Sequence, residues 1–288
     1  MMKPHTMWEE LASLPHEISF VQVGPWRTRV LTAGDGPETV VLIAGTSGHI
    51  EAHMWNLRAF AQRFSVVAYD SPGHGFTTYA THDLEIADYS EHLLGLMDVL
   101  GIDSAHISGE SLGGWIAAKF AAAHPDRVKR IVLSAPGGTM LQEERLALVR
   151  KLSQEAVDDP SYENVRERLE LVMAEPESVS EELVGIRQAI YSAPGFSESM
   201  THILCLQDPV IRQRNIISDA EFAGIPNGAL VVWTRHEPSG DVSVGQAMAD
   251  KIPGGELLLI EEAAHWPQWE QPELFNERAV AFLTAATT

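Results

Sequence analysis

The sequence predicts an α/β fold, in which a mostly parallel, doubly wound sheet carries an inserted helical lid. Short apolar runs typical of buried strands alternate with helical patterns, and a G-x-S-x-G run occupies residues 109–113. The alternation stops between about Gly137 and Phe222. Repeated strand–helix units build parallel sheets covered by helices. We expect a core made of residues 1–136 and 224–288 and a lid at residues 137–223, which 288 residues can accommodate.

The segments before the G-x-S-x-G run follow this alternation. The continuous apolar run Thr39–Ala44 predicts a strand buried on both faces. A helical pattern over Ile86–Leu100 stops at Gly101, as helices commonly do. The other elements expected here are the antiparallel strands Ile18–Val23 and Thr28–Thr32, the helix Trp55–Arg63 and the strand Ser65–Tyr69.

The run H-I-S-G-E-S-L-G-G-W, residues 106–115, places Ser111 at a sharp turn between a strand over residues 104–108 and a helix over residues 112–124. Gly109 and Gly113 suit this turn, because a side chain at either position would clash as the turn tightens. Such a strand–turn–helix is the nucleophile elbow, which exposes a serine hydroxyl above the carboxyl ends of a parallel sheet. The sequence therefore predicts that Ser111 is a catalytic nucleophile.

After the elbow, one strand precedes a purely helical stretch, and the strand–helix alternation then resumes. The predicted lid contains helical patterns at Glu143–Ala156, Ser161–Met173 and Val179–Tyr191. The core elements expected around it are the strands Val128–Ser134, Ala229–Trp233 and Glu256–Ile260, the helix Ser243–Lys251 and a last helix from Pro272.

A base and an acid follow the nucleophile in the order that this kind of elbow requires, serine, acid and histidine. His265 lies in the loop after the last strand, where it could take the proton from Ser111 and return it to the leaving group. The acid should follow the strand Ala229–Trp233. Glu237 and Asp241 both qualify, and Glu237 is favoured because it lies nearer the strand end.

The developing negative charge on a substrate oxygen requires two backbone N–H donors. Leu112 is the first expected donor, because it follows the nucleophile at a helix N-terminus. The second is expected from the loop A-G-T-S-G-H after Thr39–Ala44, whose small residues permit close approach of a ligand, and Thr46 is the preferred residue.

Composition excludes several classes of partner. The net charge of −20, from 40 acidic and 20 basic residues, disfavours nucleic acid and anionic membrane surfaces. The single Cys205 excludes an intrachain disulfide, and no run approaches the ~20 apolar residues that a membrane helix needs. With no signal-peptide pattern at the start, we expect a cytoplasmic protein that acts on a small molecule. The oligomeric state is open, with a homo-oligomer among the options.

The segment His49-Ile50-Glu51-Ala52-His53 has only a superficial likeness to a zinc site. The metalloprotease pattern H-E-x-x-H needs glutamate directly after the first histidine, and here Glu51 is one position late. No third ligand is evident. We expect neither a metal nor a cofactor.

At these residues the chain resembles the meta-cleavage product hydrolases, serine-dependent α/β-hydrolases that cut carbon–carbon bonds in ring-opened aromatic catabolites. The resemblance covers nearly the whole chain and implies the α/β-hydrolase fold. It implies that Arg187 in the lid grips the carboxylate of a dienoate substrate, and that Trp266 helps to bind it. The matching runs are A-G-T-S-G-H-I-E-A-H, S-P-G-H-G, H-I-S-G-E-S-L-G-G-W, E-E-L-V-G-I-R-Q-A-I, W-T-R-H-E-P and H-W-P-Q-W-E.

Three positions depart from the family pattern. Ala44 replaces the usual histidine before the first oxyanion glycine, and Glu237 replaces aspartate. Glu110 stands before the nucleophile, where many members that degrade biaryls have asparagine. An ionised Glu110 in the pocket would repel an anionic substrate. It could instead point into the core, pair with a basic group, or be protonated.

The resemblance implies a hydrolase for 2-hydroxy-6-oxo-2,4-dienoates, which are anionic. Two alternatives stay open: a carboxylesterase, lactonase or amidase with the same triad, and a non-catalytic ligand sensor on the same fold. For Arg187, the alternative is a surface ion pair with Glu181 or Glu182.

Overall fold

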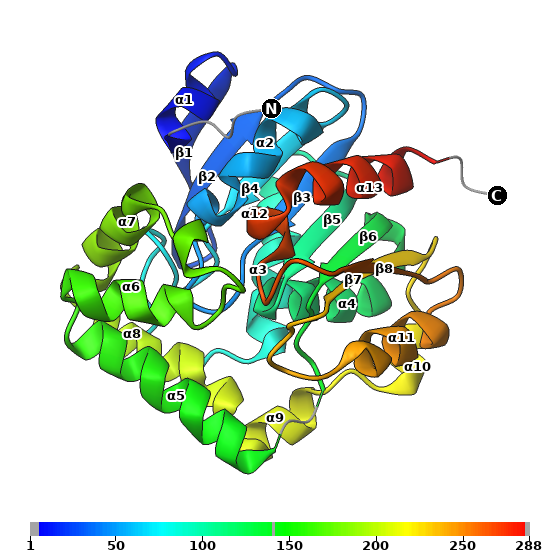
Figure 1. Cartoon of the computed structure of the whole chain (residues 1–288). Helices are drawn as coiled ribbons and strands as arrows, with labels where there is room; N and C mark the ends of the chain where they lie inside the picture. The colour runs from blue at the N-terminus through cyan, green and yellow to red at the C-terminus, as the bar shows by residue number, and fades with distance from the viewer. Residues whose placement is uncertain (1–5, 140–141, 286–288) are drawn as a thin grey trace.

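The computed structural model describes residues 6–139 and 142–285, which form an eight-stranded sheet flanked by helices (Figure 1). The strand order is β1-β2-β4-β3-β5-β6-β7-β8, with β1, β2 and β4 joined by antiparallel pairing and all other neighbours parallel. This confirms the predicted fold. The strands are β1 (His16–Val23), β2 (Trp26–Ala33), β3 (Thr39–Ile43), β4 (Ser65–Tyr69), β5 (Ala105–Glu110), β6 (Val128–Ser134), β7 (Ala229–Thr234) and β8 (Glu256–Ile260).

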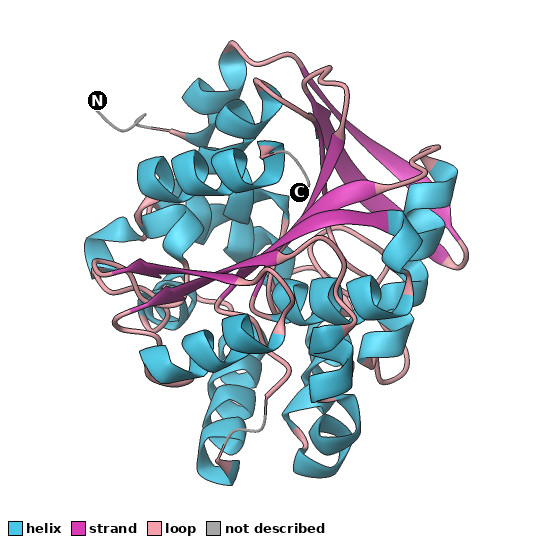
Figure 2. Cartoon of the chain, turned by 90° about the vertical axis from the view of Figure 1, so that its right-hand side faces the viewer, coloured by secondary structure: helices cyan, strands magenta, loops and turns pink. Residues whose placement is uncertain are grey.

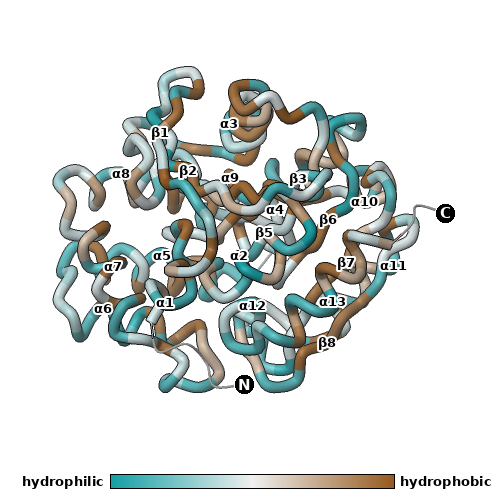
Figure 3. Tube along the Cα trace, turned by 90° about the horizontal axis from the view of Figure 1, so that it is seen from above, coloured by the Kyte–Doolittle hydropathy of each residue, from teal (hydrophilic) through white to brown (hydrophobic). Residues whose placement is uncertain are grey.

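Both faces of the sheet are buried, as Figure 2 shows with helices on either side of the strands. In β3, Val40 and Leu42 pack into one hydrophobic cluster, while Val41 and Ile43 pack into the other. Successive side chains of a strand point to opposite faces, which explains the continuous apolar run. The hydrophobic colour of β7 in Figure 3 has the same origin. Helices α2 (Met54–Ala61) and α13 (Pro272–Thr284) cover one face, and α3 (Ile86–Val99), α4 (Leu112–Ala123) and α11 (Val242–Lys251) the other.

Among the described residues, six α-helices lie between β6 and β7 in the chain, and most of them extend to one side of the sheet (Figure 1). The last of the six packs against α4 and α11 of the core. The division into a core and a lid at residues 137–223 stays a prediction. The six are α5 (Glu143–Asp158), α6 (Tyr162–Glu170), α7 (Glu181–Tyr191), α8 (Phe196–Ile203), α9 (Pro209–Asn215) and α10 (Asp219–Ala223). The sequence did not predict the short helices α8, α9 and α10, nor α1 (Met7–Ala12) and α12 (Pro267–Glu270).

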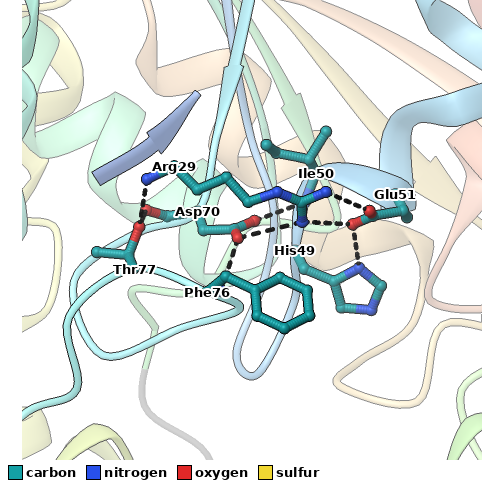
Figure 4. A network of polar contacts seen from close by, with 7 residues as sticks. All are labelled: Arg29, His49, Ile50, Glu51, Asp70, Phe76 and Thr77. Atoms are coloured by element: carbon teal, nitrogen blue, oxygen red, sulfur yellow. Dashed lines mark hydrogen bonds and ion pairs between the residues drawn. The ribbon is translucent and has the colours of Figure 1, made fainter. Parts of the chain in front are cut away.

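A buried charge network fixes the loop after β3 (Figure 4). The guanidinium of Arg29, in β2, lies 2.7 Å from Glu51 Oε1 and 3.5 Å from Asp70 Oδ2. His49 Nδ1 lies 2.9 Å from Glu51 Oε2, and the backbone N–H of Ile50 donates to Asp70. The H-I-E-A-H segment thus ties this loop to β2 and β4. Within the described ranges, no helix is long and apolar enough to span a membrane.

Candidate active site

The turn at Ser111 has the geometry that the glycine pattern predicts. Ser111 has a φ of 53°, in the left-handed region that non-glycine residues rarely adopt. A Cβ on Gly109 would collide with the backbone of Gly113, and one on Gly113 would collide with the carbonyl of Ile43. The strained turn is therefore possible only because Gly109 and Gly113 have no side chains. Their absence lets β5 and α4 come close to each other and lets α4 come close to β3.

His265 and Glu237 meet as the sequence predicts. His265 Nδ1 lies 3.0 Å and 2.9 Å from the two carboxylate oxygens of Glu237. The backbone N–H and hydroxyl of Ser239 also donate to Glu237. Asp241 is instead the N-cap of α11, where it accepts from Ser243. The geometry thus favours Glu237 over Asp241 as the carboxylate that orients His265.

The protonation of His265 reflects its surroundings. Burial disfavours the imidazolium, but the charges of Glu237 and, to a smaller extent, Glu110 outweigh it and raise the pKa of His265 to about 9. For Glu237, burial raises the pKa, but His265 and Ser239 lower it more, and the net shift is downward. The pair is therefore an ionised carboxylate holding a strongly basic imidazole.

Ser111, His265 and Glu237 line one cavity of about 300 Å³, beneath α5, α6 and α7. Thr46 and Leu112 line it as well. Leu112 is the first residue of α4, where backbone N–H groups have no partner inside the helix. The cavity thus brings the predicted nucleophile, base, acid and oxyanion donors to one place.

Glu110 lies in the same cavity. Its side chain is buried, Oε2 accepts from the N–H of Gly45 at 2.8 Å, and Oε1 lies 3.5 Å from His265 Nε2. No hydrogen-bond partner of Oε1 is present in the described structure. Burial raises the pKa of Glu110 to about 7, against the opposing effects of His265 and Gly45. Glu110 therefore faces the cavity and not the core, and it pairs with a basic group, His265, which is one of the alternatives considered from the sequence.

Arg187 is buried at 4% exposure and lines the cavity. Its NH1 donates to Ser47 Oγ at 3.3 Å and Tyr191 OH at 3.4 Å, and its guanidinium lies 5.4 Å from the ring centre of Trp266. Within the described residues, Nε and NH2 have no partner. The surface ion pair considered from the sequence is wrong, since Glu181 bonds to Tyr162 and Glu182 to the N–H of Met7.

Sequence reasoning missed three further arginines that line this cavity: Arg145, Arg168 and Arg212. All three lie in helices of the predicted lid. An arginine in an amphipathic helical pattern is indistinguishable from a solvated one until the packing is known, so no signal in the sequence identified them.

Comparison with known proteins agrees with this architecture. Residues 40–278 match the alpha/beta hydrolase family. The chain is 30% identical over 274 residues to the 2-hydroxy-6-oxo-6-phenylhexa-2,4-dienoate hydrolase of Comamonas testosteroni, covering 87% of this chain and 89% of that protein. It is also 30% identical over 263 residues to a 2-hydroxy-6-oxononadienedioate/2-hydroxy-6-oxononatrienedioate hydrolase of Burkholderia vietnamiensis, covering 87% and 88%.

Among solved structures, the meta-cleavage product hydrolase CumD of Pseudomonas fluorescens IP01 superimposes with a TM-score of 0.79 at 26% identity, covering 92% of this chain and 96% of that one. The similarity therefore extends over nearly the whole chain in both sequence and structure. The chain belongs to the alpha/beta hydrolase family, and it is a hydrolase related to those that act on meta-cleavage products.

Proposed function

We propose that this enzyme hydrolyses a carbon–carbon bond in a 2-hydroxy-6-oxo-2,4-dienoate, through a Ser111–His265–Glu237 triad and an acyl-enzyme. The main support for this substrate class is the burial of Arg187 in the cavity. Its guanidinium is buried in the cavity without a carboxylate partner in the described structure, although acids outnumber bases two to one in the chain. A buried cation with unused donors matches a substrate carboxylate, which can accept a planar pair of hydrogen bonds.

The residues of the cavity supply each step of the reaction. Proton transfer within the bound dienoate, from the 2-hydroxyl to C5, first gives the 2-oxo form. C5, the future leaving carbon, can then release its electron pair through the C3–C4 double bond to the C2 ketone. Ser111 Oγ then attacks the 6-oxo carbonyl as His265 takes its proton, and the N–H groups of Thr46 and Leu112 stabilise the resulting oxyanion. The bond between the carbonyl carbon and the neighbouring dienoate carbon breaks. The electron pair of the broken bond passes to the 2-oxygen of the leaving dienolate, which takes the proton from His265. Water, activated by His265, then releases the acyl group as a carboxylic acid.

The position of Arg187 supports this substrate class. Arg187 contacts Ser47 and lines the same cavity as Ser111, so one substrate can have its carboxylate at Arg187 and its 6-oxo carbonyl at Ser111. Glu110 faces the same space, and a dienoate would bind best while Glu110 is protonated. Its raised pKa makes this form accessible near neutral pH.

The test compares Arg187→Gln with the wild type on two substrates: a dienoate, followed by loss of its visible absorbance, and a small neutral ester. The paired hydrogen bonds between a guanidinium and a carboxylate contribute about 1.5–3 kcal/mol to binding. Their loss should lower kcat/KM for the dienoate roughly 10- to 150-fold. Ester hydrolysis should change little, because the ester has no carboxylate. Equal losses on both substrates would make Arg187 structural, and a wild type that cleaves the ester but no dienoate would make the protein an esterase or lactonase.

A further inference from the structure

The transfer of a proton from the 2-hydroxyl of a dienoate to C5 needs a group that can both give and accept a proton. Among the described residues that line the cavity, the groups that ionise are four arginines, two glutamates and His265. Arginine side chains keep their protons in proteins. His265 is the partner of Ser111, so Glu110 and Glu237 are the candidates for a separate acid.

Glu237 is fully engaged by its neighbours. Its two carboxylate oxygens lie 3.0 Å and 2.9 Å from His265 Nδ1, and Oε1 also accepts from the N–H and the hydroxyl of Ser239. Hydrogen bonds to a carboxylate favour its ionised form, and the net shift of the Glu237 pKa is downward. Glu237 therefore has no proton to give at neutral pH.

Glu110 differs from Glu237, because one of its oxygens has no hydrogen-bond partner among the described residues. Oε2 accepts from the N–H of Gly45 at 2.8 Å, whereas Oε1 is the oxygen without a partner, although the side chain is buried. An N–H group can only donate, so it favours the proton of a neutral Glu110 on Oε1. Burial raises the pKa of Glu110 to about 7, and this neutral form is therefore populated near neutral pH.

The carboxyl group of Glu110 lies next to the nucleophile. Glu110 is the last residue of β5, directly before Ser111, and both side chains line the cavity. A Cβ on Gly45 would lie 2.5 Å from Glu110 Oε2 and 2.9 Å from Ser111 Cβ, so both side chains lie against the same glycine. In a bound dienoate, Ser111 attacks C6, to which C5 is bonded. A substrate with C6 at Ser111 therefore has C5 in the space beside Glu110.

We propose that Glu110 is the catalytic acid and base of ketone formation: its carboxyl group gives a proton to C5 and receives the proton of the 2-hydroxyl. The electron pair of the C4–C5 double bond forms the new C5–H bond, and the C2–C3 pair moves to C3–C4. The pair of the broken O–H bond completes the C2 ketone. Glu110 ends in the form in which it began. The inference rests on the proposed function, which supplies the dienoate.

Glutamine at this position separates proton transfer from a structural role. Its amide oxygen can still accept from the N–H of Gly45, but the amide has no proton to give at neutral pH. If Glu110 served only to hold Gly45, Glu110→Gln would therefore have little effect on ketone formation.

The test uses Ser111→Ala, which cannot attack C6 and therefore isolates ketone formation. The probe is 2-hydroxy-6-oxo-6-phenylhexa-2,4-dienoate, followed by loss of its visible absorbance and, in D₂O, by NMR detection of deuterium at C5. Ser111→Ala should form the ketone, and the added Glu110→Gln change should slow this step by about 10²- to 10⁴-fold, the usual contribution of general acid–base catalysis. Glu110→Asp keeps a carboxyl group and should slow it less than Glu110→Gln.

Two controls accompany this measurement. Glu262→Gln, added to Ser111→Ala, should leave ketone formation unchanged, because Glu262 is exposed and does not line the cavity. In the chain with Ser111 intact, Glu110→Gln should hydrolyse a neutral ester at pH 8 faster than the wild type, because an ester needs no ketone and His265 loses a charged neighbour. Equal losses on ester and dienoate would make Glu110 structural and would overturn the inference.

The outcomes also distinguish this inference from the proposed function. Ketone formation that is unaffected by Glu110→Gln, or that is no faster in Ser111→Ala than in buffer, would overturn the inference, while cleavage of the dienoate by the wild type would still support the proposed function. Ketone formation that depends on Glu110, in a wild type that does not cleave the dienoate, would support the inference and refute the proposed function alone.

Discussion

Replacement of Glu110 by glutamine should make His265 a better base at neutral pH. The Glu110 carboxyl faces His265 Nε2 at 3.5 Å, and the other groups around it are the N–H of Gly45, Glu237 and Arg187. When ionised, Glu110 stabilises the imidazolium of His265, whose pKa is raised to about 9. Glutamine keeps the shape and can still accept from Gly45, but it carries no charge. The imidazolium loses one stabilising carboxylate, so the pKa of His265 must fall.

The size of the fall follows from the distance. Two unit charges 3.5 Å apart interact by about 1.2 kcal/mol even at the dielectric constant of water, which is about 0.9 of a pKa unit. The pKa of His265, which is about 9, would then drop by roughly one unit. At pH 8 the neutral fraction of His265 would rise from roughly a tenth to roughly a half, a gain of about fivefold. A less polar cavity would make the gain larger.

The assay is the pH dependence of kcat/KM for a neutral ester between pH 6 and 10, with the wild type and Glu110→Gln. The acid limb should move about one unit or more to lower pH, and the rate at pH 8 should rise about fivefold. Glu262→Gln is the control, since Glu262 is exposed in the same loop as His265 and does not line the cavity. A profile that superimposes on the wild type, or a limb that moves to higher pH, would refute this account of the Glu110–His265 pair.

Three other substitutions test the site and the fold. Ser111→Ala should lower kcat by ~10⁴ or more while circular dichroism stays unchanged, and retention of a tenth of the rate would exclude Ser111 as nucleophile. Glu237→Gln should slow turnover by ~10² to 10⁴. Asp241→Asn should leave kcat nearly unchanged, because Asp241 caps α11 and does not face His265; the reverse order of effects would make Asp241 the acid. Arg29→Met leaves the buried Glu51 without its cation and should lower the free energy of unfolding by about 3–5 kcal/mol, measured in urea; a loss under about 1 kcal/mol would contradict this role.

The elements that the sequence predicted well are those set by local chemistry. The strands over residues 65–69, 128–134 and 256–260 have the predicted ends, because β-branched and apolar runs bounded by turn residues specify a buried strand locally. The turn at Ser111 could be predicted from the sequence equally well, since only glycine permits the contacts at positions 109 and 113. The short helices α8, α9 and α10 were missed because helices of five to eight residues depend on tertiary packing more than on their own periodicity.

For the site, the order and spacing of Ser111, Glu237 and His265 along the chain sufficed to identify the three residues, because a nucleophile elbow constrains where its partners can follow. Which way the charged side chains face was a matter of tertiary structure alone. Glu110 could have faced the core, but contacts with the N–H of Gly45 and with His265 hold it in the cavity. Arg187 could have paired with acids on its own helix, but the packing of α7 over the sheet buries it in the same cavity. A long, charged side chain can reach several environments from one backbone position, so its burial and its partners are decided by elements far away in the sequence.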